Sequence, residues 1–184
     1  APITRIDINI DIFNSNIMDF YPYMDGANSS KIKLNEEGEI QSRIVGSNAS
    51  STRFTVYDKN AESGVKPSNK HHRLEVRIRG KRCTMDQLDE HLLLVEFNKL
   101  KFYHKGFLRN GSLSPEFKQD ARSNGLNSAL STLSKKSSSD TRKEYIKIID
   151  KYLADPFDLA NLDLSNIKQQ LRPLKSKYYQ KLAA

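Results

Sequence analysis

Residues 52–62 read Thr-Arg-Phe-Thr-Val-Tyr-Asp-Lys-Asn-Ala-Glu, and residues 71–79 read His-His-Arg-Leu-Glu-Val-Arg-Ile-Arg. Apolar and polar residues alternate in both runs, which is typical of β-strands with one buried and one polar face. The apolar positions are Phe54, Val56, Leu74, Val76 and Ile78. The polar positions hold a tyrosine, a lysine, a glutamate and several arginines. The two runs therefore predict strands with one apolar face and one face rich in polar and charged side chains.

Further strands are predicted in the N-terminal half. Residues 3–12 alternate isoleucines with Arg5, Asp7, Asn9 and Asp11, so this strand has an unusually acidic polar side. Residues 31–35 and 39–45 read as a hairpin, with Glu-Glu-Gly at 36–38 as the turn. Together these segments predict an antiparallel sheet of about five strands over residues 3–82.

The second half has the pattern of helices. A capping box at 84–87 predicts a helix to about residue 95 that covers the apolar face of the sheet. Further helices are expected from Pro115, over 126–133, over 140–153 and within 165–182, with a loop at 134–140. The expected fold class is α+β, with a sheet portion at 1–83 and a helical portion at 84–184 that packs on the sheet.

Composition favours a nucleic-acid partner. The 184 residues carry a formal net charge of +8, and basic residues gather at 66–82 and from residue 168 to the end. The single cysteine cannot form an internal disulfide, and no apolar run approaches the ~20 residues of a membrane span. We expect a soluble cytoplasmic protein that does not associate with membranes.

The polar faces suggest one candidate site. If they share one sheet, Asp7, Tyr57, Lys59 and Glu75 project into the same solvent layer. Two carboxylates can coordinate Mg²⁺ or Mn²⁺, a tyrosine oxygen can attack a phosphodiester, and a lysine can stabilise the developing charge. The alternative is a packed tyrosine beside surface ion pairs of little energetic weight. Spacing alone favours that second interpretation.

The adjacent histidines at 71 and 72 are weaker candidates for metal binding. Neighbouring residues on a strand point to opposite faces, so this pair cannot present two ligands to one ion. We interpret them as solvated loop residues.

Residues 44–62, which contain Gly46-Ser47 and Tyr57-Asp58-Lys59, and residues 73–80, Arg-Leu-Glu-Val-Arg-Ile-Arg-Gly, carry a resemblance to a known family. They resemble a conserved block of plasmid rolling-circle replication initiators and of the related relaxases of integrative conjugative elements. The gene II initiator of filamentous phages is a more distant likeness, and Thr4-Arg5-Ile6-Asp7 is similar to its strand. The resemblance covers residues 3–82 and does not extend beyond Met85.

The resemblance implies an origin-specific endonuclease that nicks one DNA strand and can rejoin it. Tyr57 would be the nucleophile that becomes joined to a 5′ phosphate, and Lys59 its electrostatic helper. Asp7 and Glu75 would bind Mg²⁺ or Mn²⁺, with Glu62 as a third ligand or water activator. The residues expected to bind DNA are Arg5, Arg53, Arg73, Arg77, Arg79, Lys81 and Arg82.

The implied partner is origin DNA, single-stranded or in a hairpin at the nick site. A host helicase and a second copy of the chain are further candidates, and the helical portion would extend the DNA contacts. The chain departs from the family where relatives carry a tyrosine before the Gly-Ser segment, because it has Arg43-Ile44-Val45 there. Two alternatives remain: a non-catalytic basic DNA-binding module, and an RNA-binding or ribosome-associated protein.

Overall fold

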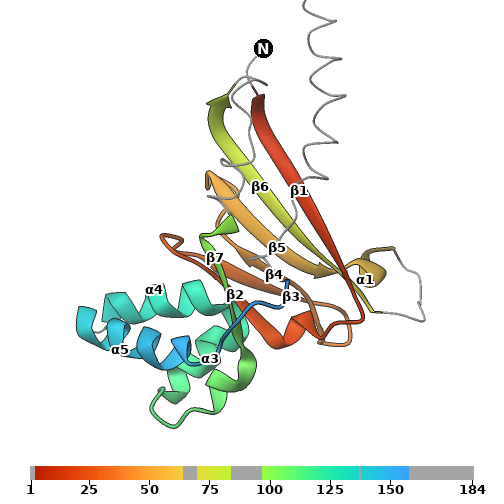
Figure 1. Ribbon diagram of the computed structural model, residues 1–184. Coiled ribbons are helices and arrows are strands. Elements are labelled where there is room, and N and C mark those ends of the chain that lie inside the picture. Colours follow the sequence, from red (N-terminus) through yellow and green to blue (C-terminus); the bar gives the residue numbers. More distant parts are fainter. Residues whose placement is uncertain (1–2, 64–69, 84–96, 137, 158–184) are drawn as a thin grey trace, which may run out of the picture.

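A five-stranded antiparallel sheet is the larger of the two sheets in the computed structural model (Figure 1), which describes residues 3–63, 70–83, 97–136 and 138–157. Of residues 3–4, 62–63, 80–83 and 136 the backbone alone is described. The strands are β1 (Ile3–Phe13), β3 (Ser30–Leu34), β4 (Ile40–Val45), β5 (Thr52–Asp58) and β6 (His71–Cys83). Their spatial order is β1-β6-β5-β4-β3, so β6 pairs with both β1 and β5.

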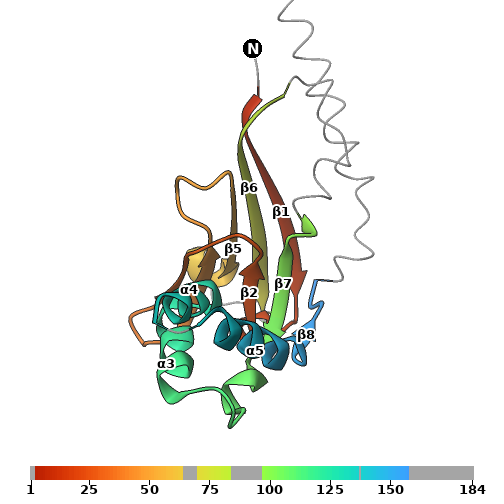
Figure 2. The same ribbon diagram turned by 90° about the vertical axis from the view of Figure 1, so that its left-hand side faces the viewer.

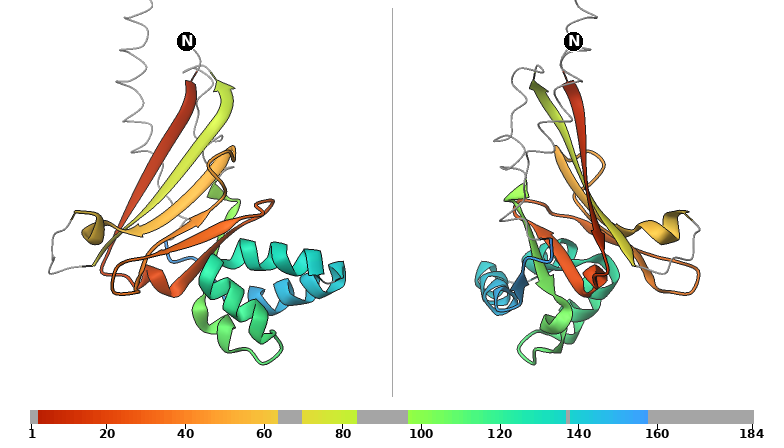
Figure 3. Two further views of the ribbon diagram at one scale, coloured as in Figure 1. Left: turned by 180° about the vertical axis from the view of Figure 1, so that it is seen from behind. Right: turned by 45° about the vertical axis from the view of Figure 1, so that its right-hand side comes forward.

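The predicted alternation is confirmed in the strands that carry the motif. Phe54, Val56, Leu74 and Val76 are at most 1% exposed, whereas the residues between them are partly exposed. On β1, Ile8 is buried and the other even-numbered isoleucines that the structure describes pack against the same core. Figure 3 shows that the long strands β1 and β6 continue past the ends of the shorter strands.

A second, three-stranded sheet was not predicted from the sequence. It consists of β2 (Phe20–Met24), β7 (Leu100–His104) and β8 (Leu153–Ala154) in the order β2-β7-β8. Pro22 lies on β2, which is an edge strand in this sheet, and there a missing N–H is tolerated. Because β2 and β7 are mostly buried along their length, they lack the alternation that revealed the other strands.

The small sheet separates two hydrophobic cores. On one side, Met24, Leu100 and Phe102 pack with the apolar face of the large sheet. On the other side, Tyr21 and Tyr103 pack with the helical residues Phe117, Leu126, Leu130 and Ile149. The described residues are thus arranged in three layers, and Figure 2 shows the small sheet beside the helices. The helix expected to cover the large sheet, at 84–95, lies outside the described residues.

The helices are α1 (Lys59–Ser63), α3 (Pro115–Asn124), α4 (Leu126–Lys136) and α5 (Ser139–Asp150), with 3-10 turns η1 (Ile17–Asp19) and η2 (Lys105–Arg109). Ser114 caps α3 by accepting a hydrogen bond from Phe117 N, as its Ser-Pro start predicts. The loop predicted at 134–140 is largely wrong, because α4 continues to Lys136 and Ser138 caps α5.

The α+β class and the five-stranded antiparallel sheet are therefore confirmed, with helices in the C-terminal half. The proposed division at residue 83 stays a prediction, and β2 from the first part pairs with β7 from the second. Within the described residues, no helix combines the length and the apolar character that crossing a bilayer requires.

Candidate functional site

The polar face of the large sheet aligns several of the predicted site residues in rows that run across the strands. Tyr57 on β5 is in register with Arg73 on β6 and with Ser42 on β4. Arg73 in turn lies opposite Asp11 on β1. Residues directly opposite on one face of an antiparallel pair have Cβ atoms about 4.5–5.5 Å apart, so the four side chains form a continuous strip.

Asp11 holds Arg73 at its place in this strip. Arg73 Nε donates to Asp11 Oδ1 over 2.7 Å, and Nη2 donates to Oδ2 over 2.9 Å. These hydrogen bonds raise the pKa of Arg73 and lower the pKa of Asp11. Asp11 was not among the predicted site residues, although its place on the acidic side of the first strand was recognised. Only the register of β1 against β6 reveals its partner.

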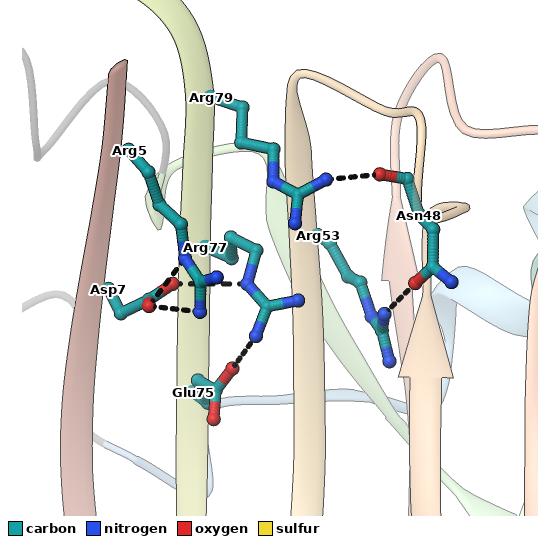
Figure 4. Close-up of polar contacts among 7 residues, drawn as sticks. All are labelled: Arg5, Asp7, Asn48, Arg53, Glu75, Arg77 and Arg79. Carbon is teal, nitrogen blue, oxygen red and sulfur yellow. Dashed lines mark hydrogen bonds and ion pairs between the residues drawn. The ribbon is translucent and has the colours of Figure 1, made fainter. Parts of the chain in front are cut away.

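The two predicted metal ligands flank one guanidinium, as Figure 4 shows. Arg77 Nε donates to Asp7 Oδ1 over 3.1 Å, and Arg77 Nη2 donates to Glu75 Oε1 over 3.0 Å. Asp7 also accepts a hydrogen bond of 2.7 Å from Arg5 Nε. The structure therefore brings Asp7 and Glu75 together, but with Arg77 between them.

The charge state of Asp7 follows from these neighbours. Partial burial acts to raise the pKa of this carboxyl, and the hydrogen bonds from Arg5 and Arg77 act in the opposite direction. The arginines prevail, so the pKa of Asp7 lies below its ordinary value. Asp7 is consequently an ionised acceptor at neutral pH.

Arg53 and Arg79 converge on the loop after β4. Arg79 Nη1 donates to the backbone carbonyl of Asn48 over 2.7 Å, and Arg53 Nη1 donates to the Asn48 side chain (Figure 4). Desolvation and the nearby charge of Arg77 lower the pKa of Arg53. Sequence reasoning missed Asn48, although the residue stands in the Gly-Ser segment of the motif. Its role depends on how the loop folds back toward β6.

Tyr57 and Lys59 belong to different elements, because β5 ends at Asp58 and Lys59 begins α1. Asp58 Oδ1 accepts hydrogen bonds from the backbone N–H of Asn60 (2.8 Å) and of Ala61 (3.3 Å), which favours a helical turn here. The prediction that Lys59 lies on the strand was therefore wrong. Its ammonium still lies 5.9 Å from the centre of the Tyr57 ring.

A shallow groove of about 300 Å³ runs over this face. Its lining includes Tyr57, Glu75, Arg53, Arg77 and Thr55. Residues from the neighbouring strands β3 and β4, such as Lys33, Ser42 and Ile44, form its other side. The groove thus joins the candidate nucleophile, one candidate metal ligand and two of the predicted DNA-binding arginines in one depression.

For three of the predicted site residues, the structure describes the backbone alone. Glu62 lies in α1, and Lys81 and Arg82 lie near the end of β6. Their roles as third ligand and DNA contacts stay predictions.

The loop interpretation of the histidines was wrong, since His71 and His72 begin β6. They point to opposite faces, as expected of neighbours on a strand. His71 Nε2 lies 3.1 Å from Asp11 Oδ1 and its ring stacks on Phe13, whereas His72 is only 6% exposed.

The donor chemistry of this face suits a hard divalent cation only in part. Asp7 and Glu75 supply carboxylate oxygens of the kind that Mg²⁺ and Mn²⁺ prefer. The described residues contain no cluster of three histidine, cysteine, aspartate or glutamate side chains that could hold a metal ion. A cation between the two carboxylates would have to displace the Arg77 guanidinium.

The chain is similar in structure to a rolling circle replication initiator protein from Geobacillus stearothermophilus. The two share 19% sequence identity with a TM-score of 0.39, and the match covers 64% of this chain. The chain spans about half of that protein, since 50% of the latter is covered. No family model matches the sequence, and no curated protein matches it.

Proposed function

We propose that the chain nicks and rejoins single-stranded DNA through Tyr57, in the manner of a rolling-circle initiator or relaxase. The observation that carries this proposal is the groove that joins Tyr57 with Glu75, Arg53 and Arg77 on the polar face of the sheet. A tyrosine that served only for packing would need no such surroundings. The family that the sequence resembles has corresponding Tyr-Asp-Lys and Arg-Leu-Glu segments, in the same order along the chain.

In this reaction the Tyr57 oxygen attacks the phosphorus of one phosphodiester. The new bond joins the tyrosine to the 5′ phosphate, and the bond from phosphorus to the 3′ oxygen breaks. The leaving 3′ oxygen ends as a free hydroxyl, and its attack on the phosphotyrosine rejoins the strand. Lys59, near the tyrosine ring, stabilises the negative charge that develops during the attack.

The arginines position the strand by contacts with its phosphates. Arg53, Arg77 and Arg79 lie along the polar face from the groove toward the loop that contains Asn48. Phosphate contacts of this kind position a nucleic acid without reading its sequence. Asp7 and Glu75, with Glu62 as a third ligand, would hold Mg²⁺ or Mn²⁺, which would neutralise charge on the scissile phosphate.

The test is covalent trapping with a pool of randomised single-stranded oligonucleotides labelled at the 3′ end. The phosphotyrosine stays with the 3′ part of the cleaved strand, so the label should migrate with the protein on a denaturing gel. We expect this adduct with Mn²⁺ in the wild type and its loss in Tyr57→Phe, while DNA binding is retained. Tyr152→Phe, which changes a tyrosine outside the groove, is the control and should form the adduct normally.

An adduct that persists in Tyr57→Phe would show that another residue is the nucleophile. A second candidate function, a non-catalytic DNA-binding module, is favoured by the position of Arg77 between the two carboxylates. Wild-type protein that binds the pool and forms no adduct under any divalent metal would support this second function.

A further inference from the structure

A second cavity lies on the opposite face of the large sheet, at the end where β1 and β5 finish and β4 and β6 begin. Its volume is about 610 Å³, and η1, η2 and α3 contribute to its wall. Asp58 lines both this cavity and the groove on the polar face. The residues proposed to act in DNA nicking do not line this cavity, so that reaction does not account for it.

Arg43 is the most unusual residue in the wall of this cavity. Its position in register with Val56 places it on the apolar face, where it is only 3% exposed. Nη2 donates to the backbone carbonyl of Met18 over 3.1 Å, and the guanidinium lies 3.8 Å from the centre of the Tyr21 ring. Nε and Nη1 are buried and have no hydrogen-bond partner among the described residues. Burial lowers the pKa of Arg43, as expected for a desolvated cation.

Two further buried polar atoms line the same cavity without a hydrogen-bond partner in the described part of the chain. They are Nδ1 of His72, which is 6% exposed, and Oγ of Ser15. Buried polar groups in folded proteins are nearly always paired, because leaving one unpaired costs about 1–3 kcal/mol. Unpaired atoms from three segments that surround one cavity indicate a ligand that supplies their partner.

The charges around the cavity favour an anion. Its described lining contains four basic residues, Arg43, Lys70, Lys105 and Arg122, and three acidic residues, Asp19, Glu39 and Asp58. Two of the acids already have partners, because Asp19 pairs with Lys105 at 2.7 Å and Asp58 accepts the N–H groups of α1. The buried Arg43 forms no ion pair with a carboxylate among the described residues, and Asp19, whose charge acts on it, is already paired with Lys105.

We propose that this cavity binds a phosphate group, with Arg43 and His72 as its principal donors. Arginine is favoured at phosphate sites because its planar guanidinium presents several N–H donors to the oxygens. The volume lies within the range of about 300–1,000 Å³ that is typical of small-molecule sites. Met18, Ile40 and Leu108 add apolar surface on which a sugar or base can pack. The phosphate can therefore belong to free phosphate, to a mononucleotide or to the end of a DNA strand.

Calorimetric titration of the full chain with four probes tests the proposal and separates these sources. The probes are inorganic phosphate, deoxyadenosine monophosphate, and a short single-stranded oligonucleotide with either a 5′ phosphate or a 5′ hydroxyl. We expect saturable binding of at least one phosphate-bearing probe, and the tightest one identifies the source. Arg43→Met should weaken this binding about 10–100-fold, the loss typical of hydrogen bonds to a charged group. Arg109→Met, which changes an exposed arginine outside the cavity, should leave it unchanged.

Thermal unfolding of the same variants shows whether a loss of binding results from a loss of folded structure. Because Arg43 is a buried cation with unpaired N–H groups, Arg43→Met should melt at the same or a higher temperature. If this variant fails to fold, His72→Leu provides the second measurement and should also lose the binding. The proposal is overturned if no probe binds the wild type, or if the folded variants bind the probe as tightly as the wild type does. Neither result bears on the adduct at Tyr57, which is assayed separately.

Discussion

The ammonium of Lys59 lies 5.9 Å from the centre of the Tyr57 ring, although the two residues belong to different elements. Asp58 causes this arrangement, because its side chain accepts the first N–H groups of α1 and ends the strand. The motif Tyr-Asp-Lys therefore places a phenol on a rigid strand and a cation at the start of a helix beside it.

The position of Lys59 predicts a contribution to the chemical step. Lys59→Met should slow formation of the Tyr57 adduct about 10–100-fold at saturating DNA, because it removes a charge that stabilises the transition state. Lys59→Arg should recover part of the rate. Single-turnover kinetics, with an oligonucleotide recovered as the covalent adduct, measure the rate of adduct formation in both variants. An unchanged rate in Lys59→Met would assign the lysine a structural role.

Removal of Arg77 should expose the two carboxylates that it joins. In Arg77→Met, Asp7 and Glu75 lose a competing cation, so we expect tighter Mn²⁺ binding and weaker DNA binding than in the wild type. Arg79→Met is the matched control, since Arg79 donates to the Asn48 carbonyl and not to these carboxylates. Calorimetry with Mn²⁺ distinguishes them. Equal Mn²⁺ affinity in all three proteins would argue against Asp7 and Glu75 as ligands.

The loop to which Arg53 and Arg79 donate hydrogen bonds requires a glycine at position 46. Its φ is +88°, and a Cβ at this position would lie 2.8 Å from the Thr52 carbonyl oxygen. Gly46→Ala should therefore lower the free energy of unfolding by about 1–3 kcal/mol. Gly38→Ala is the control: its φ is +79° and a Cβ there would meet nothing within 4 Å, so it carries the backbone cost alone. Denaturant titration measures both, and equal losses would contradict a steric role of Thr52.

His72 predicts how stability changes with pH. Burial lowers the pKa of His72 in the folded state, with smaller opposing and supporting effects of Asp58, Lys70 and His71. The unfolded chain therefore takes up the proton first, at its ordinary pKa of about 6.5. The contribution of His72 is fully present above that pH and is lost as the pH falls below it.

The measurement is the free energy of unfolding between pH 7.5 and pH 5.5, in buffers without phosphate. The loss of stability toward acid should be smaller in His72→Gln than in the wild type, and His71→Gln serves as the control on the other face of β6. If the free energy of unfolding of His72→Gln fell with pH as steeply as that of the wild type, other groups would be the cause of the acid sensitivity.

Much of the large sheet could be predicted because its information is local. The alternation in residues 53–57 and 73–79 shows which side chains are buried, and period-two patterns need no knowledge of the partner strand. The small sheet could not be predicted in this way. Phe20 pairs with His104 across more than eighty residues, and both strands are mostly buried along their length.

The candidate site divides in the same manner. Alternation places Tyr57, Glu75 and Asp7 on the polar face, but it does not indicate which residues are neighbours across the strands. The register opposes Asp11 to Arg73 and sets Arg77 between the carboxylates. The turn into α1 moved Lys59 off the strand, because the capping oxygen of Asp58 competes with continued pairing.

The sequence by itself determined which faces of the strands are apolar and which chemical groups stand on the polar face, since alternation is a property of consecutive residues. Tertiary structure alone decided that Tyr57 shares a groove with Glu75 and Arg77, and that Arg43 is buried with unpaired donors in a second cavity. Both depend on pairing between strands and layers that are distant in the chain, where the register, and not the local pattern, sets the distances.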